Sequence, residues 1–143
     1  MARSDFIVIV GCGRVGSLLA NRMSATGHKL VVIDEHEVAF DKLSNEFSGF
    51  RIIGDAIEMR VLREARLEQA DYLFAVTRND NINLMVAQVG LKVFNVPRVI
   101  ARVYDPAREA LYREFGIETI SPTKLTAEAV QVVLNANTPE RKS

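Results

Sequence analysis

Residues 7–16 have the sequence IVIVGCGRVG, in which four apolar residues lead directly into three glycines spaced G-x-G-x-x-G. The apolar run predicts a buried strand. Beyond the turn, apolar residues recur at helical spacing, at Val15, Leu18, Leu19, Ala20 and Met23. A strand, a tight turn and a helix in this order form the context in which the three glycines indicate a dinucleotide site. The segment therefore predicts the first unit of a parallel α/β sheet.

Each of the three glycines has a separate expected role. We expect Gly11 to form the tight turn, Gly13 to let a pyrophosphate approach the backbone, and Gly16 to let the helix pack closely on the strand. The amino end of the helix then offers free N–H groups and a positive dipole potential to an anion. The turn is therefore a candidate phosphate site.

Five more apolar runs follow, separated from one another by helical patterns. The expected strands cover residues 30–33, 50–53, 72–76, 98–103 and 117–120. The expected helices cover residues 14–26, 37–46, 57–65, a stretch ending near 94, a stretch from 105 to 116, and 121–135. In the second and third helices we expect these apolar residues to face inward: Val38, Leu43 and Phe47, then Ile57, Val61, Leu62 and Ala65. Strict alternation predicts a Rossmann-like α/β fold, with a doubly wound, parallel six-stranded sheet in a single domain.

The composition of the 143 residues is typical of one globular domain. Its 18 basic and 18 acidic residues balance, so no strong field favours nucleic acid or a membrane surface. A single cysteine excludes an intramolecular disulfide and suits a reducing compartment. The sequence contains no signal-peptide pattern and no apolar run of membrane-spanning length, so we expect a cytoplasmic protein. We expect the domain to cover residues 1–137, without a substrate domain, and residues 138–143 to form a disordered tail.

Polar residues gather where the expected strands end, and in a parallel sheet these ends line the ligand crevice. Asp34 follows Gly16 by 18 residues, close to the spacing at which a carboxylate binds ribose hydroxyls. The same carboxylate disfavours a 2′-phosphate, so we expect NADP to bind poorly. Helix capping is the alternative interpretation for two of the other acids, Asp55 and Asp80.

Arg14 follows the second glycine and lies over the expected phosphate. A cation there suits a charge-assisted hydrogen bond to phosphate, whereas a merely solvated arginine is slightly unfavourable in the first turn of a helix. We interpret Cys12 as a small loop residue rather than a reactive thiol. His28 and His36 have no Cys or second His at ligand spacing, so we predict no metal site.

The last expected helix has an apolar face about twice as wide as packing on a sheet requires. Its apolar residues fall on two stripes, one with Leu125, Ala129, Val132 and Val133, the other with Ala127, Val130 and Leu134. A monomer rarely exposes such a surface. The helix is therefore either deeply buried or packed on a second chain, and we favour the second interpretation.

The sequence contains no recognisable catalytic motif. None of its three tyrosines is followed four residues later by lysine, and neither a G-x-S-x-G elbow nor a P-loop is present. We therefore predict a nucleotide sensor without catalytic residues rather than an enzyme. Two alternatives stay open: a small NAD-dependent oxidoreductase, and a nucleotide-binding interaction protein unrelated to ion transport.

Several motifs in this order resemble the RCK N-terminal domain, also called the TrkA-N or KTN domain. They are residues 11–16 (GCGRVG), 32–34 (VID), 54–56 (GDA), 70–72 (ADY), 75–83 (AVTRNDNIN) and 100–102 (IAR). The resemblance runs from about Phe6 to Val133. The glycine motif alone is generic, but the ordered set is specific.

The resemblance implies a cytoplasmic regulatory subunit at the inner face of the membrane, attached to a potassium channel or a Trk/Ktr-type transporter. Members bind NAD(H), ATP, ADP or AMP, form dimers and octameric rings, and some assemble with a second RCK subunit. The helix after the sixth strand packs across the dimer in this family. The implied nucleotide contacts include Asp34, Thr77 and Arg102, with Arg14 at the phosphates.

Two departures from the family qualify these implications. Many members carry a C-terminal ligand-binding domain, which this sequence lacks, so regulation would depend on the nucleotide site or on a separate partner. Thr123 stands where some ATP-binding members have an acidic, cation-linked residue, which argues against a metal-assisted ATP site. The candidate nucleotide-binding set is Gly11, Cys12, Gly13, Arg14, Val15, Gly16, Asp34, Glu35, Gly54, Asp55, Ala56, Thr77, Arg78, Asp80, Asn83 and Arg102.

Overall fold

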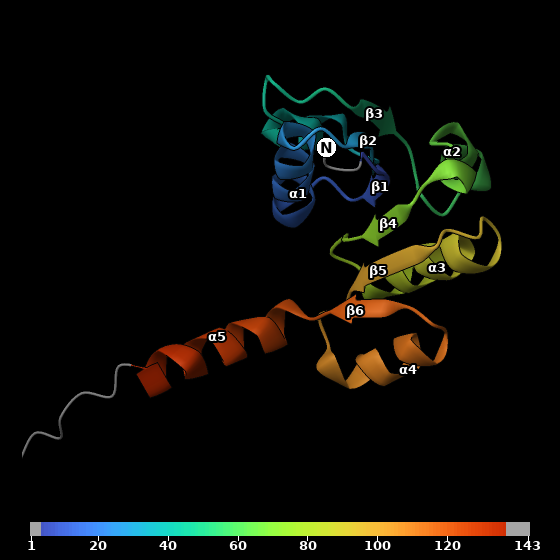
Figure 1. Cartoon of the computed structure of the whole chain (residues 1–143). Coiled ribbons are helices and arrows are strands. Elements are labelled where there is room, and N and C mark those ends of the chain that lie inside the picture. Colours follow the sequence, from blue (N-terminus) through green and yellow to red (C-terminus); the bar gives the residue numbers. More distant parts are fainter. Residues whose placement is uncertain (1–3, 137–143) are drawn as a thin grey trace, which may run out of the picture.

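Six parallel strands form one sheet in the order β3-β2-β1-β4-β5-β6 (Figure 1). The computed structural model describes residues 4–136. The strands are β1 (Phe6–Val10), β2 (Lys29–Asp34), β3 (Phe50–Ile53), β4 (Tyr72–Ala75), β5 (Arg98–Arg102) and β6 (Glu118–Ile120). The Rossmann-like, doubly wound fold predicted from the alternating pattern is confirmed.

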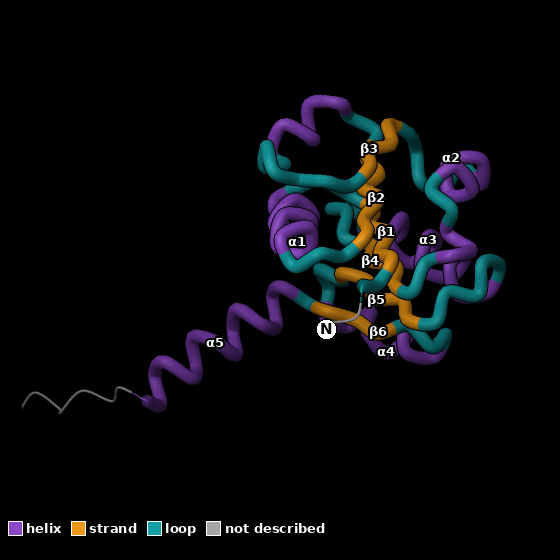
Figure 2. The backbone as a smooth tube through the Cα atoms, turned by 45° about the horizontal axis from the view of Figure 1, so that its top comes forward, coloured by secondary structure: helices purple, strands orange, loops and turns teal. Residues whose placement is uncertain are grey.

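Helices cover both faces of the sheet, as Figure 2 shows with the sheet seen nearly edge-on. On one face lie α1 (Arg14–Ala25) and the 3₁₀ helix η1 (Glu37–Lys42). On the other lie α2 (Met59–Glu64), α3 (Asp80–Lys92) and α4 (Glu109–Glu114), with short 3₁₀ turns at η2 (Leu67–Gln69) and η3 (Pro106–Arg108). Because parallel strands are buried on both faces, their sequences are nearly continuous apolar runs.

Two hydrophobic clusters fill the space between the sheet and the helices. Alternate residues of β1 enter different clusters: Ile7 and Ile9 pack toward α1, whereas Val8 and Val10 pack toward α2 and α3. This alternation follows from the two-residue period of a strand. The central strands are thus held from both sides, and their carboxyl ends occupy defined positions at one edge.

The α-helix predicted over residues 37–46 is wrong, because the structure has only the six-residue 3₁₀ helix η1 there. The Asn21 side chain of α1 explains why the helix ends: it donates to the Lys42 carbonyl oxygen at 3.2 Å and accepts from the Ser44 N–H at 2.8 Å. Leu43 and Phe47 are buried as expected. Val38 is not, since 70% of its surface is exposed.

The third expected helix starts two residues later than the apolar pattern indicates. The N–H of Ile57 donates to the Asp55 carboxylate at 3.1 Å, and the chain enters α2 only at Met59. Ile57 is therefore 46% exposed rather than buried, whereas Val61, Leu62 and Ala65 are buried as expected. Similarly, the helix expected after Asp105-Pro106 consists of η3 followed by α4.

The last helix, α5 (Pro122–Ala136), projects away from the sheet and its covering helices (Figures 1 and 2). None of its residues, all within the described part of the chain, is buried. The first interpretation, deep burial within its own chain, is therefore wrong, and packing on a second chain stays a prediction. The expected tail at 138–143 lies outside the described residues. Across residues 4–136, no helix combines the length and apolar character needed to cross a membrane.

Candidate functional site

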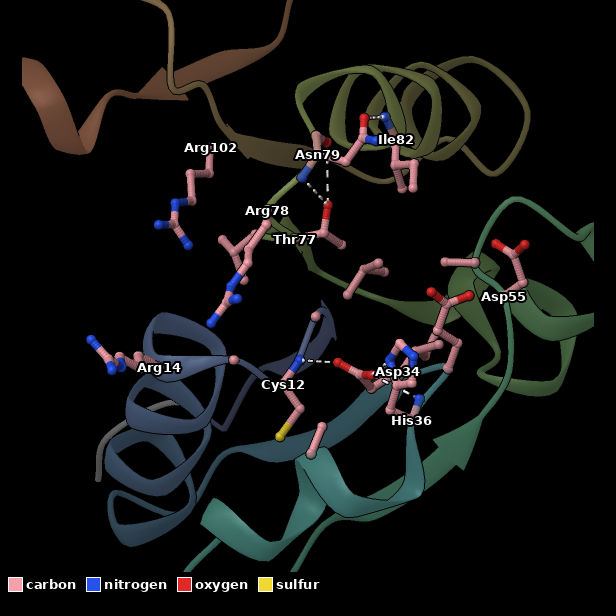
Figure 3. A pocket seen from close by; sticks show the side chains of 18 of the residues that line it. Cys12, Arg14, Asp34, His36, Asp55, Thr77, Arg78, Asn79, Ile82 and Arg102 are labelled. Atoms are coloured by element: carbon pink, nitrogen blue, oxygen red, sulfur yellow. Dashed lines mark hydrogen bonds and ion pairs between the residues drawn. The ribbon is translucent and has the colours of Figure 1, made fainter.

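A cleft of about 720 Å³ opens at the carboxyl ends of the strands, between the β1–α1 turn and the loops after β2, β3, β4 and β5 (Figure 3). The strand order reverses between β1 and β4, and open α/β sheets bind ligands at such a switch point. Twelve residues of the candidate set line it: Gly11, Cys12, Gly13, Arg14, Asp34, Glu35, Gly54, Asp55, Ala56, Thr77, Arg78 and Arg102. Val15, Gly16, Asp80 and Asn83 are not among the lining residues.

The three glycines of the turn meet different surroundings. Gly11 has a φ of +104°, and a Cβ there would lie 3.0 Å from the Thr77 backbone nitrogen. A Cβ on Gly16 would lie 1.8 Å from the Gly11 carbonyl oxygen, so α1 could not approach β1 with any larger residue. A Cβ on Gly13 would meet no described atom within 4 Å. Gly13 thus leaves open space over the turn, where a ligand could approach the backbone.

The amino end of α1 faces this open space. Gly13 is its N-cap residue and, having no side chain, accepts no capping hydrogen bond from the first-turn N–H groups. The first turn of the helix also contains no acidic residue. The unpaired N–H groups and the helix dipole are therefore available to a negatively charged group.

Asp34, at the end of β2, holds the glycine turn in place. One carboxylate oxygen accepts a hydrogen bond from the Cys12 N–H at 2.8 Å, and the other accepts from the His36 N–H at 2.9 Å. The His36 ring nitrogen lies 3.6 Å from the same carboxylate. A carboxylate oxygen can accept more than one hydrogen bond, so Asp34 retains capacity for a ligand hydroxyl. Across residues 4–136, no three His, Cys, Asp or Glu side chains group to hold a metal ion.

Cys12 is fully buried beneath the turn. Burial raises the pKa of its thiol to about 11, and the nearby Asp34 carboxylate contributes to the increase. The thiol therefore remains protonated at neutral pH. Cys12 contributes its backbone N–H to the turn and a small apolar side chain to the core around α1.

Three arginines from different elements lie beside the turn, on the same side of the cleft in Figure 3. Arg14 comes from α1, Arg78 from the loop after β4, and Arg102 from the end of β5. The Arg102 guanidinium lies over the Tyr104 ring, 4.3 Å from its centroid. Its Nε is buried and has no hydrogen-bond partner among the described residues. A buried, unpaired donor of positive charge at this position fits an anionic ligand.

Asn83 and Asp80 do not line the cleft, but their side chains hold the backbone segments that border it. The Asn83 side-chain oxygen accepts from the N–H and hydroxyl of Thr77, at 2.9 and 2.6 Å, and its amide nitrogen donates to the carbonyl oxygens of Thr77 and Arg102, both at 3.0 Å. Asp80 accepts from the Tyr104 N–H at 2.8 Å. The cap of α3 is Asn79 rather than Asp80. These side chains fix the ends of β4 and β5 relative to each other.

Ten lining residues lie outside the candidate set, and three of them, Val10, Ile33 and Val76, are buried at the strand ends. The other seven are His36, Val38, Ala39, Lys42, Asn79, Ile82 and Tyr104. Four lie in η1 or just before it, and Val38 is exposed because it faces the cleft instead of the core. Val38, Ala56 and Ile82 give the cleft apolar lining from three different segments of the chain, and apolar contact of this kind suits a planar base. Proximity to a strand end was the only sequence signal for these residues.

Comparison with known proteins relates the chain to potassium uptake proteins. The sequence pattern described as the TrkA-N domain matches residues 7–122. The "Trk system potassium uptake protein TrkA" of Streptomyces coelicolor is 42% identical over 122 residues, which cover 85% of this chain and 55% of the relative. The chain therefore spans just over half the length of that protein.

Two solved structures share the fold. The TrkA-N domain of the inner membrane protein ybaL from Escherichia coli superposes with a TM-score of 0.82 at 24% identity, covering 94% of this chain and 99% of that one. The Kef CTD of Shewanella denitrificans, in an AMP-bound form, has a TM-score of 0.75 at 21% identity, covering 90% of this chain and 82% of that one.

Proposed function

The chain belongs to the TrkA-N domain family, and on this basis we propose that it is the nucleotide-sensing, gating part of a potassium uptake channel or transporter. In this proposal it binds an adenine nucleotide (AMP, ADP or ATP) or NAD(H) in the cleft and does not turn it over. The signal is then the change in conformation or assembly that the bound ligand stabilises.

One observation carries the proposal: the unpaired Arg102 Nε, the open space over Gly13 and the Asp34 carboxylate all border the same cleft. We assign the phosphates to the amino end of α1 with Arg14 and Arg102, and the ribose hydroxyls to Asp34. The base would lie against Val38, Ala56 and Ile82, beside Asp55. The negative charges of Asp34 and Glu35 disfavour the 2′-phosphate of NADP.

The relatives support this assignment in two ways. The relative from Streptomyces coelicolor is named as a potassium uptake protein. The Kef CTD structure, which has the same fold, holds AMP. Neither finding selects one nucleotide for this chain, because the adenosine half is shared by all the candidates.

We also propose a domain over residues 1–137 that forms a homodimer through α5 and, with further copies or a second RCK subunit, a ring. Its position would be the cytoplasmic face of a membrane, against the potassium-conducting subunit. The exposed apolar residues of α5 support the dimer. Co-purification with a membrane subunit tests the link to transport, and absence of such a complex would favour an unrelated nucleotide-binding protein.

Calorimetric titration with AMP, ADP, ATP, NAD⁺, NADH and NADPH tests the nucleotide site. We expect Asp34→Asn to weaken AMP binding by roughly 1.5–3 kcal/mol, because the ribose loses a charged hydrogen-bond partner. Asparagine retains one oxygen that can accept from the Cys12 N–H, so the turn should survive, while the exposed His36 N–H turns to water. Asp41→Asn, on η1 but outside the cleft lining, is the control. Unchanged AMP affinity in Asp34→Asn would contradict the ribose assignment.

The oxidoreductase alternative has its own test. We expect no steady change in nicotinamide absorbance when the protein is mixed with NADH and small carbonyl compounds. Sustained NADH consumption at a rate proportional to protein concentration would establish turnover and contradict the proposed sensor.

A further inference from the structure

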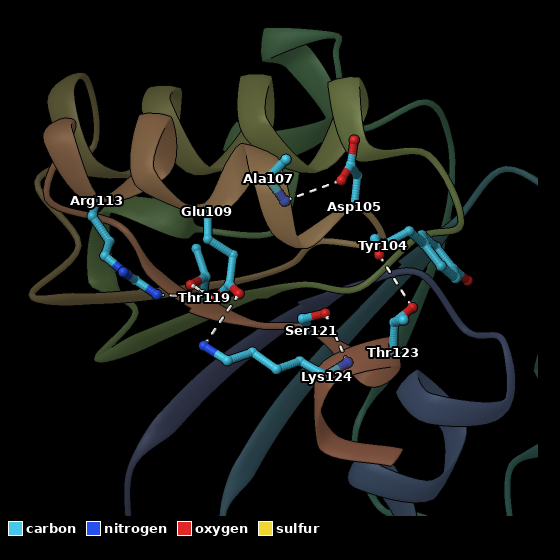
Figure 4. A network of polar contacts seen from close by, with 9 residues as sticks. All are labelled: Tyr104, Asp105, Ala107, Glu109, Arg113, Thr119, Ser121, Thr123 and Lys124. Carbon is cyan, nitrogen blue, oxygen red and sulfur yellow. Dashed lines mark hydrogen bonds and ion pairs between the residues drawn. The ribbon is translucent and has the colours of Figure 1, made fainter. Parts of the chain in front are cut away.

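We propose that Tyr104 connects the nucleotide cleft to α5. The Arg102 guanidinium contacts the Tyr104 ring, and the Thr123 hydroxyl donates a hydrogen bond to the Tyr104 carbonyl oxygen. This inference rests on the proposed nucleotide site and adds the path by which that site reaches the exposed helix. The segment between β5 and η3 carries Tyr104, and Figure 4 shows it beside the start of α5.

On the cleft side, the Tyr104 ring contacts Arg102, the residue whose Nε has no hydrogen-bond partner among the described residues. The Arg102 guanidinium lies 4.3 Å from the centre of the Tyr104 ring, and both residues line the cleft. A charge-assisted hydrogen bond to phosphate is stronger than a cation–π contact of this kind. A phosphate within reach would therefore draw the guanidinium away from the ring and satisfy the buried Nε.

Hydrogen bonds hold the backbone around Tyr104 in position. The N–H groups of Tyr104 and Asp105 both donate to the Asp80 carboxylate, at 2.8 and 3.4 Å. Asp105 also caps η3 by accepting from the Ala107 N–H at 3.0 Å. These hydrogen bonds join Tyr104 and Asp105 into one unit with Asp80, so a displacement of the ring moves the carbonyl oxygen of the same residue with that unit.

On the helix side, that carbonyl oxygen accepts a hydrogen bond from the Thr123 hydroxyl at 3.2 Å. Thr123 is the second residue of α5, whose residues are all unburied in the described chain. Without a buried face, the direction of α5 depends strongly on contacts at its first turn. A shift of the Tyr104 carbonyl therefore changes the direction in which the helix projects.

A second contact in the first turn of α5 has no connection to the cleft. The Lys124 ammonium lies 3.8 Å from the Glu109 carboxylate, which also accepts from the Thr119 hydroxyl at 2.7 Å (Figure 4). Neither Lys124 nor Glu109 lines the cleft. This pair holds the helix without sensing the ligand, so it offers a matched control.

The test measures the distance between α5 and the domain with spin labels. Labels are placed on cysteines introduced at Val130, on α5, and at Val93, at the end of α3, which are 63% and 54% exposed. The buried thiol of Cys12 should remain unlabelled. An excess of unlabelled protein suppresses distances between chains. AMP, ADP, ATP and NADH are added separately, and the affinity of each variant is measured by calorimetry.

We expect at least one of these ligands to change the distance distribution in the parent protein. Thr123→Val should abolish the change while leaving affinity within about twofold, whereas Lys124→Met should retain it. Tyr104→Leu should also abolish the change, and Tyr104→Phe should restore it because the ring and the carbonyl oxygen are kept.

Two results separate this inference from the proposed function. Binding without a distance change in the parent, or an undiminished change in Thr123→Val, overturns the coupling through Tyr104 and leaves the nucleotide site intact. If none of the four ligands binds the parent protein, the proposed function fails, and the coupling fails with it.

Discussion

Cys12 illustrates at the scale of one residue how burial decides reactivity. It is the only cysteine in the sequence, it has no exposed surface, and the pKa of its thiol is raised to about 11. Since the thiolate is the reactive form, we expect alkylation by iodoacetamide at pH 8 to be at least about 100-fold slower in the native protein than in urea. Mass spectrometry of timed samples measures both rates. Native and unfolded rates within tenfold of each other would contradict this expectation.

Glu109 is a buried carboxylate at the start of α4. A hydrogen bond from the Thr119 hydroxyl, and then the charges of Lys124 and Arg113, hold its pKa below the usual range, although burial acts in the opposite direction. The folded-state pKa is thus lower than the unfolded one. The resulting stabilisation is present above the unfolded pKa, near 4.3, and disappears as pH falls through the folded value.

We expect Glu109→Gln to lower the free energy of unfolding by about 1 kcal/mol at pH 7, with the difference from the parent shrinking between pH 5 and pH 3. Urea unfolding at several pH values measures it. Glu58→Gln removes an exposed partner of Arg60 and serves as the control, with a change expected within about 0.5 kcal/mol. A difference that grows as the pH falls would contradict the stabilising role of the ionised Glu109.

At the scale of elements, two glycines of the β1–α1 turn have different expected roles. Replacing one should lower the stability of the fold, and replacing the other should weaken nucleotide binding. A Cβ on Gly16 would collide with backbone, so we expect Gly16→Ala to lower the free energy of unfolding by at least about 1–3 kcal/mol. Gly13 has a φ of −78° and open space around it, so Gly13→Ala should fold with nearly unchanged stability. Its methyl group should instead weaken nucleotide binding at least about tenfold, because it occupies the space over the turn.

Thermal unfolding and calorimetric titration of the two variants measure these effects. If Gly13→Ala bound nucleotide as tightly as the parent, the phosphates would not lie over Gly13. If Gly16→Ala were as stable as the parent, the close approach of α1 to β1 would not depend on glycine.

At the same scale, η1 shows that apolar residues at helical spacing are not sufficient to form an α-helix. The apolar spacing of residues 37–46 suits a helix, and two of its three inward-facing predictions are correct. The helix nevertheless ends at Lys42, because Asn21 of α1 binds the backbone on both sides of Leu43. That contact joins residues more than twenty positions apart, so local sequence could not reveal it. It also leaves Val38 free to line the cleft.

At the scale of the whole molecule, the exposed apolar residues of α5 carry a prediction about assembly. Val130 and Val133 are 63% and 62% exposed. We expect the double variant Val130→Glu/Val133→Glu to shift the protein from dimer to monomer, because it places charges where a partner chain would bury apolar surface. Sedimentation velocity measures the state, and Gln131→Glu adds a charge to α5 without removing an apolar side chain.

The stability of each folded chain should change little in the double variant, since α5 buries none of its described residues against its own domain. A parent protein that sediments as a monomer, or a double variant that remains a dimer, would contradict the assembly through α5.

The sequence by itself determined the order of strands and helices, the turn at Gly11 to Gly16 and the position of Asp34 at the end of β2. These features depend on local preferences: apolar runs, glycine conformations and fixed spacings. Only the tertiary structure showed which polar residues at the strand ends bind the backbone and which face the cleft without a hydrogen-bond partner in the described chain. Asn83 and Asp80 bind backbone across the sheet, while the Arg102 Nε is left unpaired in the cleft. The physical reason is that hydrogen-bond partners depend on which loops the parallel sheet brings together.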